Sequence, residues 1–341
     1  MTVCAAIFGL AGPTLGDGER RFFRSAAPAG FVLFARNCRT PDQVRALTAE
    51  LREAVGRSEL PILIDQEGGR VARLKPPHWR SGPPAAAFGA LADRDPAAAV
   101  EAVRLNARLI GLELAGLGIT VDCLPVLDLR RPETHTAIGD RAFHADPRIV
   151  TALGRAACEG LLASGVLPVI KHMPGHGRAT VDSHHELPRI SAPLETLRAA
   201  DFVPFRALRA MPLGMTGHLL FEAIDGNRPA SQSALVIGDI IRRDIGFDGL
   251  LISDDLGMRA LAGSAGERAA ACLAAGCDVA LHCSGVLSEM EEVAAAAGPL
   301  RPESQARLER AMALLRATPA TGEAPAVLAG RLDRLMQHAR A

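Results

Sequence analysis

Short apolar runs alternate with longer stretches of helical periodicity along most of the chain. A short apolar run that is bounded by glycine, proline or polar residues is typical of a strand buried on both faces. Helical segments between such strands predict a parallel sheet, because parallel strands need crossover connections. The runs with this character are residues 3–9, 30–35, 61–65, 118–126, 166–171, 212–218, 249–254 and 278–283.

Helix start and stop signals occupy most of the intervening segments. Thr40 followed by Pro41 is a helix start, since a hydroxyl can cap the first turn and proline fits its first position. Glycine soon after the last periodic residue is a common stop signal. The predicted helices span about 40–56, 96–116 or 96–118, 147–164, 193–210, 233–244, 264–276 and 286–297, with two more in 302–341.

Eight strand and helix pairs within about 300 residues favour a closed (β/α)8 barrel over an open doubly wound sheet. A glycine-rich phosphate loop of the GxGxxG or GxxxxGK[ST] type does not follow the first run. The sequence therefore predicts an α/β protein with a single TIM-like barrel over residues 1–341 and a C-terminal helical tail from about 302.

Composition narrows the class of protein. The chain has 341 residues, 48% of them hydrophobic, and its 38 basic residues equal its 38 acidic ones, which is typical of a neutral globule rather than a nucleic-acid binder. The seven cysteines show no compact metal-binding spacing, which favours reduced thiols. The N-terminal stretch has no basic segment before its apolar residues, and no run reaches membrane-spanning length. We expect a cytoplasmic protein with no membrane or nucleic-acid partner and no cofactor; the sequence does not indicate the oligomeric state.

Polar side chains gather at the ends of the predicted strands. Catalytic groups of such barrels lie at the carboxyl ends of the strands and on the loops that follow. The residues at or just beyond these ends are Asn37, Asp65, Asp128, Lys171, His172, His218 and Asp254.

The segment "VIKHMPGHGRATVDSHHELP" (169–188) holds four of the ten histidines. His172 and His176 have the spacing of a zinc-binding helix, but Pro174 and Gly175 lie between them and disfavour a helix. Ser183 is not in a GxSxG nucleophile motif. We therefore expect neither a metal site nor a serine hydrolase.

Carboxylate and histidine chemistry is the remaining interpretation. Asp182 and His184 are two positions apart, so an extended backbone places both on one face, where the carboxylate can orient the imidazole. They could equally be solvated loop residues. Asp254 follows a buried strand and is either a helix cap or a nucleophile; Asp255 can serve as the cap instead.

Several motifs together resemble one known family. The segments "KHMPGHG" with "DSH" four residues later, "DQEGGRVAR", "LFARN", "PVLDL", "IGDRAFHADP" and "SDDLGM" are similar to bacterial β-N-acetylhexosaminidases of glycoside hydrolase family 3. The matching blocks run in family order from about residue 31 to residue 283.

The resemblance implies a retaining enzyme that removes terminal, non-reducing β-linked N-acetylglucosamine, in many bacteria during cytoplasmic recycling of cell-wall muropeptides. It implies that Asp254 is the nucleophile and that His184 is the general acid/base, with Asp182 as its partner. The residues implied to hold the sugar are Asp65, Arg73, Arg141, Lys171 and His172, with His176 and His218 shaping or lining the pocket.

The substrate is expected to be small. The chain has no tyrosine and a single tryptophan, Trp79, so a long cleft lined by aromatic sugar platforms is not indicated. A pocket for one terminal sugar fits better. The alternatives are a β-glucosidase or β-xylosidase, a phosphorylase, a substrate-assisted route in which Asp254 orients the acetamido group, and a non-catalytic sugar-binding protein.

Overall fold

The fold is a closed barrel of parallel strands surrounded by helices. The computed structural model describes residues 2–183, 185–316 and 323–338. Around the barrel the strand order is β1-β12-β11-β9-β7-β6-β3-β2, and every neighbouring pair is parallel. The strands are β1 (Cys4–Phe8), β2 (Pro28–Leu33), β3 (Ile62–Ile64), β6 (Val121–Asp122), β7 (Leu167–Met173), β9 (Leu213–Thr216), β11 (Leu250–Asp255) and β12 (Val279–His282).

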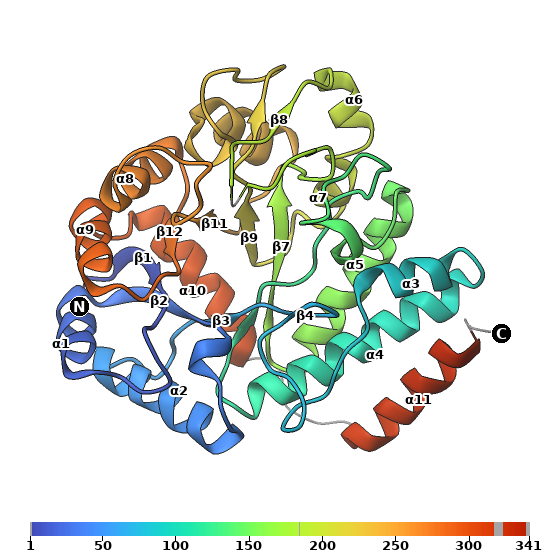
Figure 1. Ribbon diagram of the computed structural model, residues 1–341, viewed down its shortest axis with the longest axis horizontal. Helices are drawn as coiled ribbons and strands as arrows, with labels where there is room; N and C mark the ends of the chain where they lie inside the picture. The colour runs from blue at the N-terminus through green and yellow to red at the C-terminus, as the bar shows by residue number, and fades with distance from the viewer. Residues whose placement is uncertain (1, 184, 317–322, 339–341) are drawn as a thin grey trace.

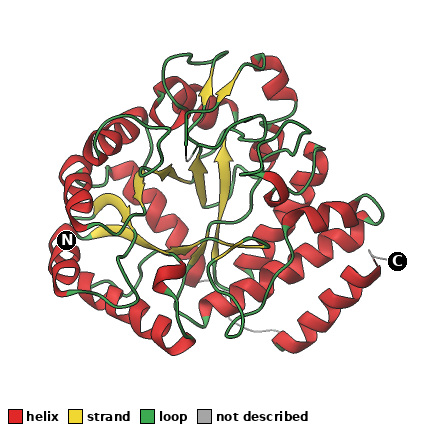
Figure 2. Cartoon of the chain, viewed as in Figure 1, coloured by secondary structure: helices red, strands yellow, loops and turns green. Residues whose placement is uncertain are grey.

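Helices form the outer layer (Figure 2). They are α1 (Asp17–Ala26), α2 (Pro41–Val55), α3 (Ala85–Ala92), α4 (Pro96–Ala115), α5 (Pro147–Leu162), α6 (Leu194–Ala199), α7 (Val203–Ala207), the π-helix η4 (Val236–Asp244), α8 (Ala265–Ala275), α9 (Leu287–Ala297), α10 (Pro302–Arg316) and α11 (Pro325–His338). None of these helices, in the described part of the chain, has the length and apolar character that a bilayer span needs.

The predicted (β/α)8 barrel is confirmed, and each predicted apolar run contains or overlaps one barrel strand. Two helix predictions need correction. Residues 193–210 form α6 and α7 instead of one helix, because Pro204 lacks the N–H that a continuous helix would use. Residues 233–244 contain a π-helix, whose wider turn the 3.6-residue pattern did not predict.

The loops at the carboxyl ends of the strands carry small additional elements. After β3 the chain forms an antiparallel hairpin, β4 (Gln66–Gly68) and β5 (Val71–Ala72). After β7, the two-residue strand β8 (Arg189–Ile190) pairs in parallel with β10 (Leu220–Phe221). The 3-10 turns η1 (Ala35–Asn37), η2 (Gly139–Arg141) and η3 (Ala230–Gln232) complete these loops. The hairpin, α1 and α3 were not predicted.

The C-terminal helices close and brace the barrel. Leu308, Ala311 and Met312 of α10 pack against the barrel interior, where they meet side chains such as Leu213 and Leu250. Helix α11 lies along the outside of α4 (Figure 1). Because α10 occupies the amino-terminal end of the barrel, the opposite end is the one open to a ligand.

Candidate active site

A cavity of about 290 Å³ opens at the carboxyl ends of the strands. Its apolar floor comes from the barrel interior and includes Val32, Cys123, Met215 and Leu281. The charged and polar lining residues are Asp65, Arg70, Arg73, Arg141, Lys171, His172, His176, Asp182, Ser183, Asp254 and Asp255. The cavity therefore gathers most of the predicted site residues, although they come from six different strand ends and loops.

Asp254 lies on β11 and is 7% exposed at the cavity surface. One carboxylate oxygen accepts the Asp255 N–H at 2.9 Å. Burial alone would raise the pKa of this carboxyl, but His172, His218 and the Asp255 N–H outweigh burial and hold the pKa below its usual range. Asp254 is therefore ionised at neutral pH, as a nucleophile must be.

Neither Asp254 nor Asp255 caps a helix. The next helix, α8, begins after Ser264, whose side chain accepts the Glu267 N–H in a capping box. Among the described residues no helix begins directly after Asp255, and the chain forms turns there. Asp255 instead accepts the N–H groups of Gly257 and Cys283, both at 3.0 Å, so it fixes the loop that follows the strand of Asp254.

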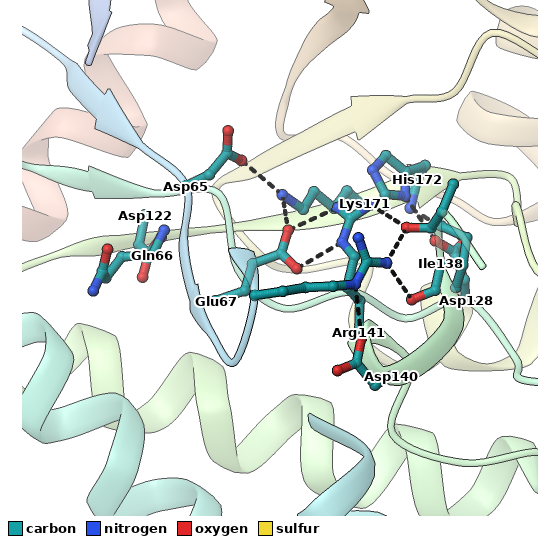
Figure 3. Close-up of polar contacts among 12 residues, drawn as sticks. Asp65, Gln66, Glu67, Asp122, Asp128, Ile138, Asp140, Arg141, Lys171 and His172 are labelled. Carbon is teal, nitrogen blue, oxygen red and sulfur yellow. Dashed lines mark hydrogen bonds and ion pairs between the residues drawn. The ribbon is translucent and has the colours of Figure 1, made fainter. Parts of the chain in front are cut away.

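Lys171, on β7, lies between two carboxylates (Figure 3). Its ammonium is 2.9 Å from Asp65 and 2.6 Å from Glu67. Burial would lower its pKa, but the two carboxylates outweigh burial and raise the pKa above its ordinary value. An ammonium has three N–H donors, so two bonds leave a third donor for a ligand in the cavity.

Asp65 and Glu67 connect Lys171 to two arginines. Asp65 accepts from Arg73 at 3.0 Å, and Glu67 accepts from Arg141 at 2.8 and 2.7 Å in a bidentate pair. Burial would raise both carboxyl pKa values, but the cations prevail: the pKa of Glu67 is about 2, and that of Asp65 lies well below its usual range. Sequence reasoning did not single out Glu67, although its place in "DQEGGR", two residues after Asp65, was the available signal.

Asp128 orients both histidines of the KHMPGH segment. It accepts from His172 Nδ1 at 2.7 Å and from the His176 backbone N–H at 2.6 Å. Burial would raise the pKa of Asp128, but His172 holds it below its usual range. An ionised Asp128 can only accept, so His172 carries a proton on Nδ1 and its Nε2 is available to the cavity.

The two histidines do not form a metal-binding helix face. His172 is part of β7, and the His176 ring lies edge-on to it with a centroid distance of 5.6 Å. Burial lowers the pKa of His176 to about 4, so this ring is neutral at pH 7. No group of three or more His, Cys, Asp or Glu side chains in metal-binding geometry occurs among residues 2–183, 185–316 and 323–338.

His218 lies behind the cavity and does not line it. It is fully buried, and its two ring nitrogens contact Ser231 Oγ at 2.7 Å and the Asp255 carbonyl at 3.0 Å. A carbonyl only accepts, so Nε2 carries the proton and donates to Asp255. The expected pocket residue therefore shapes the site indirectly, by holding the loop beside Asp254. Asn37, another predicted rim residue, likewise bonds the backbone of its own and the neighbouring loop.

The loop after β7 carries Asp182 and Ser183 to the cavity wall, whereas His184 lies outside the described residues. The base of this loop is closely packed: a Cβ on Gly177 would lie 2.0 Å from the Leu129 carbonyl oxygen. Arg178 donates to buried Asp201 at 2.9 Å.

The tip of the same loop contacts the segment that follows Asp254. The Ala260 N–H donates to the Ser183 carbonyl at 3.3 Å, and Ser183 Oγ lies 3.8 Å from Met258 Sδ. Asp182, the residue before Ser183, lines the same cavity as Asp254.

Asp122, on β6, is a buried carboxyl near this charge network. One oxygen accepts the Gln66 N–H at 3.0 Å, and the other has no hydrogen-bond partner among the described residues. Burial raises its pKa to about 8, so the group is protonated at neutral pH. It is a second residue that sequence reasoning did not identify, because its neighbours Asp65, Glu67 and Lys171 are distant in sequence.

The raised pKa of Asp122 predicts a pH-dependent cost in stability. An unfolded aspartate ionises at about pH 4, whereas folded Asp122 ionises at about pH 8. Between these two pH values the unfolded chain has lost this proton and the folded chain keeps it. The free energy of unfolding then falls as pH rises through this window. We expect Asp122→Asn to remove that dependence. In thermal unfolding, the melting temperature of the variant should therefore rise relative to that of the wild type from pH 5 to pH 8. Parallel profiles for the two proteins would contradict the assignment.

Comparisons with known proteins agree with the fold. The sequence model described as the N-terminal domain of glycosyl hydrolase family 3 matches residues 18–316. The chain therefore belongs to glycosyl hydrolase family 3. It is a glycoside hydrolase, which confirms the family resemblance of the motifs.

A β-hexosaminidase of Alkalilimnicola ehrlichii is 41% identical over 282 residues, which cover 82% of this chain and 80% of that protein. One from Chromobacterium violaceum is 39% identical over 305 residues, covering 88% and 84%. Among solved structures, NagZ from Neisseria gonorrhoeae in complex with N-trifluoroacetyl-D-glucosamine superimposes with a TM-score of 0.87 at 32% identity, covering 99% of each chain. Within family 3, the chain therefore belongs to the bacterial β-N-acetylhexosaminidases.

Proposed function

We propose that this protein is an exo-acting, retaining β-N-acetylglucosaminidase. It releases terminal, non-reducing β-linked N-acetylglucosamine, with cytoplasmic cell-wall muropeptides as the natural source. The observation that carries the proposal is an ionised Asp254 at the end of β11, inside a cavity that also presents Lys171 and Asp182. The relatives named β-hexosaminidase and the neighbour bound to a glucosamine derivative support the sugar.

The cavity supports an exo mode of action. Its volume of about 290 Å³ is at the lower end of the range for small-molecule sites, about 300 to 1,000 Å³. Charged donors and acceptors on its wall suit sugar hydroxyls, and α10 closes the far end of the barrel. One terminal sugar enters, and the remainder of the substrate stays at the mouth.

The reaction proceeds in two displacements. Asp254 attacks the anomeric carbon, while His184 gives its proton to the departing glycosidic oxygen and the Asp182 charge stabilises the imidazolium. His184 then takes a proton from water, whose oxygen displaces Asp254 and regenerates both groups. Retaining glycosidases generally use a carboxylate pair about 5–5.5 Å apart, and here a histidine takes the second role. Asp65, Arg73, Arg141, Lys171 and His172 hold the sugar hydroxyls.

The role of His184 predicts a dependence on the leaving group. We expect His184→Ala to lose much more activity on a glycoside with a poorly acidic leaving group than on an activated aryl glycoside, whose oxygen departs without a proton. Measuring kcat/KM across aryl glycosides of graded acidity tests this. An equal loss across the series would argue against leaving-group protonation by His184.

The sugar specificity is tested with aryl glycosides. We expect rapid turnover of an aryl β-N-acetylglucosaminide and little turnover of the matched β-glucoside and β-xyloside, with Asp254→Asn inactive on all three. Addition of phosphate should not yield sugar 1-phosphate. Preference for the glucoside would instead indicate a β-glucosidase. Phosphate-dependent release would indicate a phosphorylase, and binding without turnover would indicate a non-catalytic sugar-binding protein.

A further inference from the structure

Ion pairs link five alternating charges beside the cavity, in the order Arg73, Asp65, Lys171, Glu67 and Arg141. Four of these side chains line the cavity, and Glu67 does not. It is 6% exposed and lies behind Lys171 and Arg141, on the hairpin strand β4 (Figure 3). Its position raises the question of why a buried carboxylate is kept behind the sugar-binding surface.

We propose that Glu67 is a positioning residue for glycoside hydrolysis, which fixes the Lys171 ammonium and the Arg141 guanidinium at one spacing against the sugar. The inference rests on the proposed function, because it assigns a task to the groups that hold the substrate. Glu67 itself does not contact the substrate.

A single oxygen of Glu67 sets the distance between the two cations. Oε1 accepts from Arg141 Nη2 at 2.7 Å and lies 2.6 Å from Lys171 Nζ. The other oxygen accepts from Arg141 Nε at 2.8 Å, so the planar guanidinium is also fixed in orientation. The shared oxygen couples a residue on the barrel strand β7 to a residue in η2, which lies in the loop between β6 and α5.

Little else among the described contacts holds the two cations in place. Arg141 also donates to the Ala137 carbonyl at 3.1 Å, and Lys171 also contacts Asp65 at 2.9 Å. Without the Glu67 charge, three cations would share the single carboxylate of Asp65. Like charges that share one small, buried region repel, so Lys171 and Arg141 would separate and their donors would lose alignment with the sugar.

The same arrangement affects the protonation of Lys171. Burial would lower the pKa of its ammonium, and Asp65 and Glu67 outweigh burial, while Arg141 acts against them. The remaining titratable groups around the ammonium are Cys123 and Asp122 beside β6, and Asp254 on β11. Loss of the Glu67 charge therefore lowers the pKa of Lys171 and weakens the electrostatic hold on its ammonium.

Two substitutions separate charge from geometry. Glu67→Gln keeps the shape and removes the charge, whereas Glu67→Asp keeps the charge and withdraws the shared oxygen. We expect E67Q to lower kcat/KM at pH 7 by about 10- to 100-fold, the range for a hydrogen bond to a charged group. E67D, which keeps the charge, should restore most of that loss.

The matched control is Glu159→Gln, which breaks a glutamate–arginine pair between α5 and α4 on the outer surface. It should keep wild-type kcat/KM. All variants are assayed on whichever aryl glycoside the wild type hydrolyses, so a wild type that prefers another sugar refutes the proposed specificity without affecting the Glu67 comparison.

Three outcomes would overturn the inference: a folded E67Q with wild-type kcat/KM, a loss of activity in E67D as large as that in E67Q, or failure of both E67Q and E67D to fold in thermal unfolding. The last two would make Glu67 a structural residue only.

Discussion

Replacing Asp254 with asparagine should reduce kcat/KM for an aryl β-N-acetylglucosaminide by on the order of 10³-fold or more. The amide is almost the same size as the carboxylate, but it is neutral and a poor nucleophile. It can neither attack the anomeric carbon nor oppose the positive charge that develops there. Asp254 is buried and its pKa is lowered, so its negative charge interacts strongly with the reacting carbon. Losing that charge is therefore especially damaging.

Asp239→Asn is the matched control for this substitution, because Asp239 lies on η4 at the surface and pairs with Arg243. It should leave both activity and thermal stability unchanged. Asp254→Asn should unfold at or near the wild-type temperature, since the substitution removes the nucleophile but keeps the size of the side chain. A folded D254N enzyme within tenfold of wild-type kcat/KM would contradict the nucleophile assignment.

The largest loss of stability is expected at the opposite end of the barrel. Asp278 is 1% exposed and lies directly before β12, where it accepts from Arg242 at 2.6 Å and from Arg307 of α10 at 3.0 Å. It also accepts from Ser304 Oγ and the Leu251 N–H. We expect Asp278→Ala to lower the free energy of unfolding by about 3–5 kcal/mol, because two arginines and an N–H group lose a shared acceptor.

Denaturant unfolding of Asp278→Ala beside Asp42→Ala measures this effect. Asp42 forms an exposed pair with Arg45, and its loss should cost less than about 1 kcal/mol. Equal losses from the two substitutions would mean that the junction of α10 with the barrel contributes little to stability. Because the candidate active site lies at the other end of the barrel, the Asp278→Ala molecules that remain folded should keep the wild-type KM.

The barrel could be predicted from sequence because its strands are buried on both faces. Each strand then appears as a short continuous apolar run, and the polar residues at its end mark the catalytic rim. Helices with strong start signals, such as α2 after Thr40, were predicted to within a residue or two. Helices α1 and α3 were not predicted, and Pro204 broke a helix that periodicity alone had predicted as continuous.

The charge network could not be predicted, because it depends on contacts between distant segments. Lys171 and Asp65 are 106 positions apart, and Glu67 meets Arg141 from 74 positions away. Local sequence therefore identified Asp65, Lys171 and Arg141 through motifs, but it gave no sign that Glu67 joins two of them. His218 illustrates the converse: its strand-end position indicated the cavity, whereas the fold turns it toward Ser231.

The central claim is that Asp254 forms a covalent bond to the sugar, and a trapping experiment tests it most directly. The enzyme is incubated with an activated 5-fluoro glycoside of N-acetylglucosamine, digested, and analysed by mass spectrometry. We predict one sugar adduct, on the peptide that contains Asp254 and on that side chain. Turnover of the reagent with no adduct, or an adduct on another residue, would contradict the account.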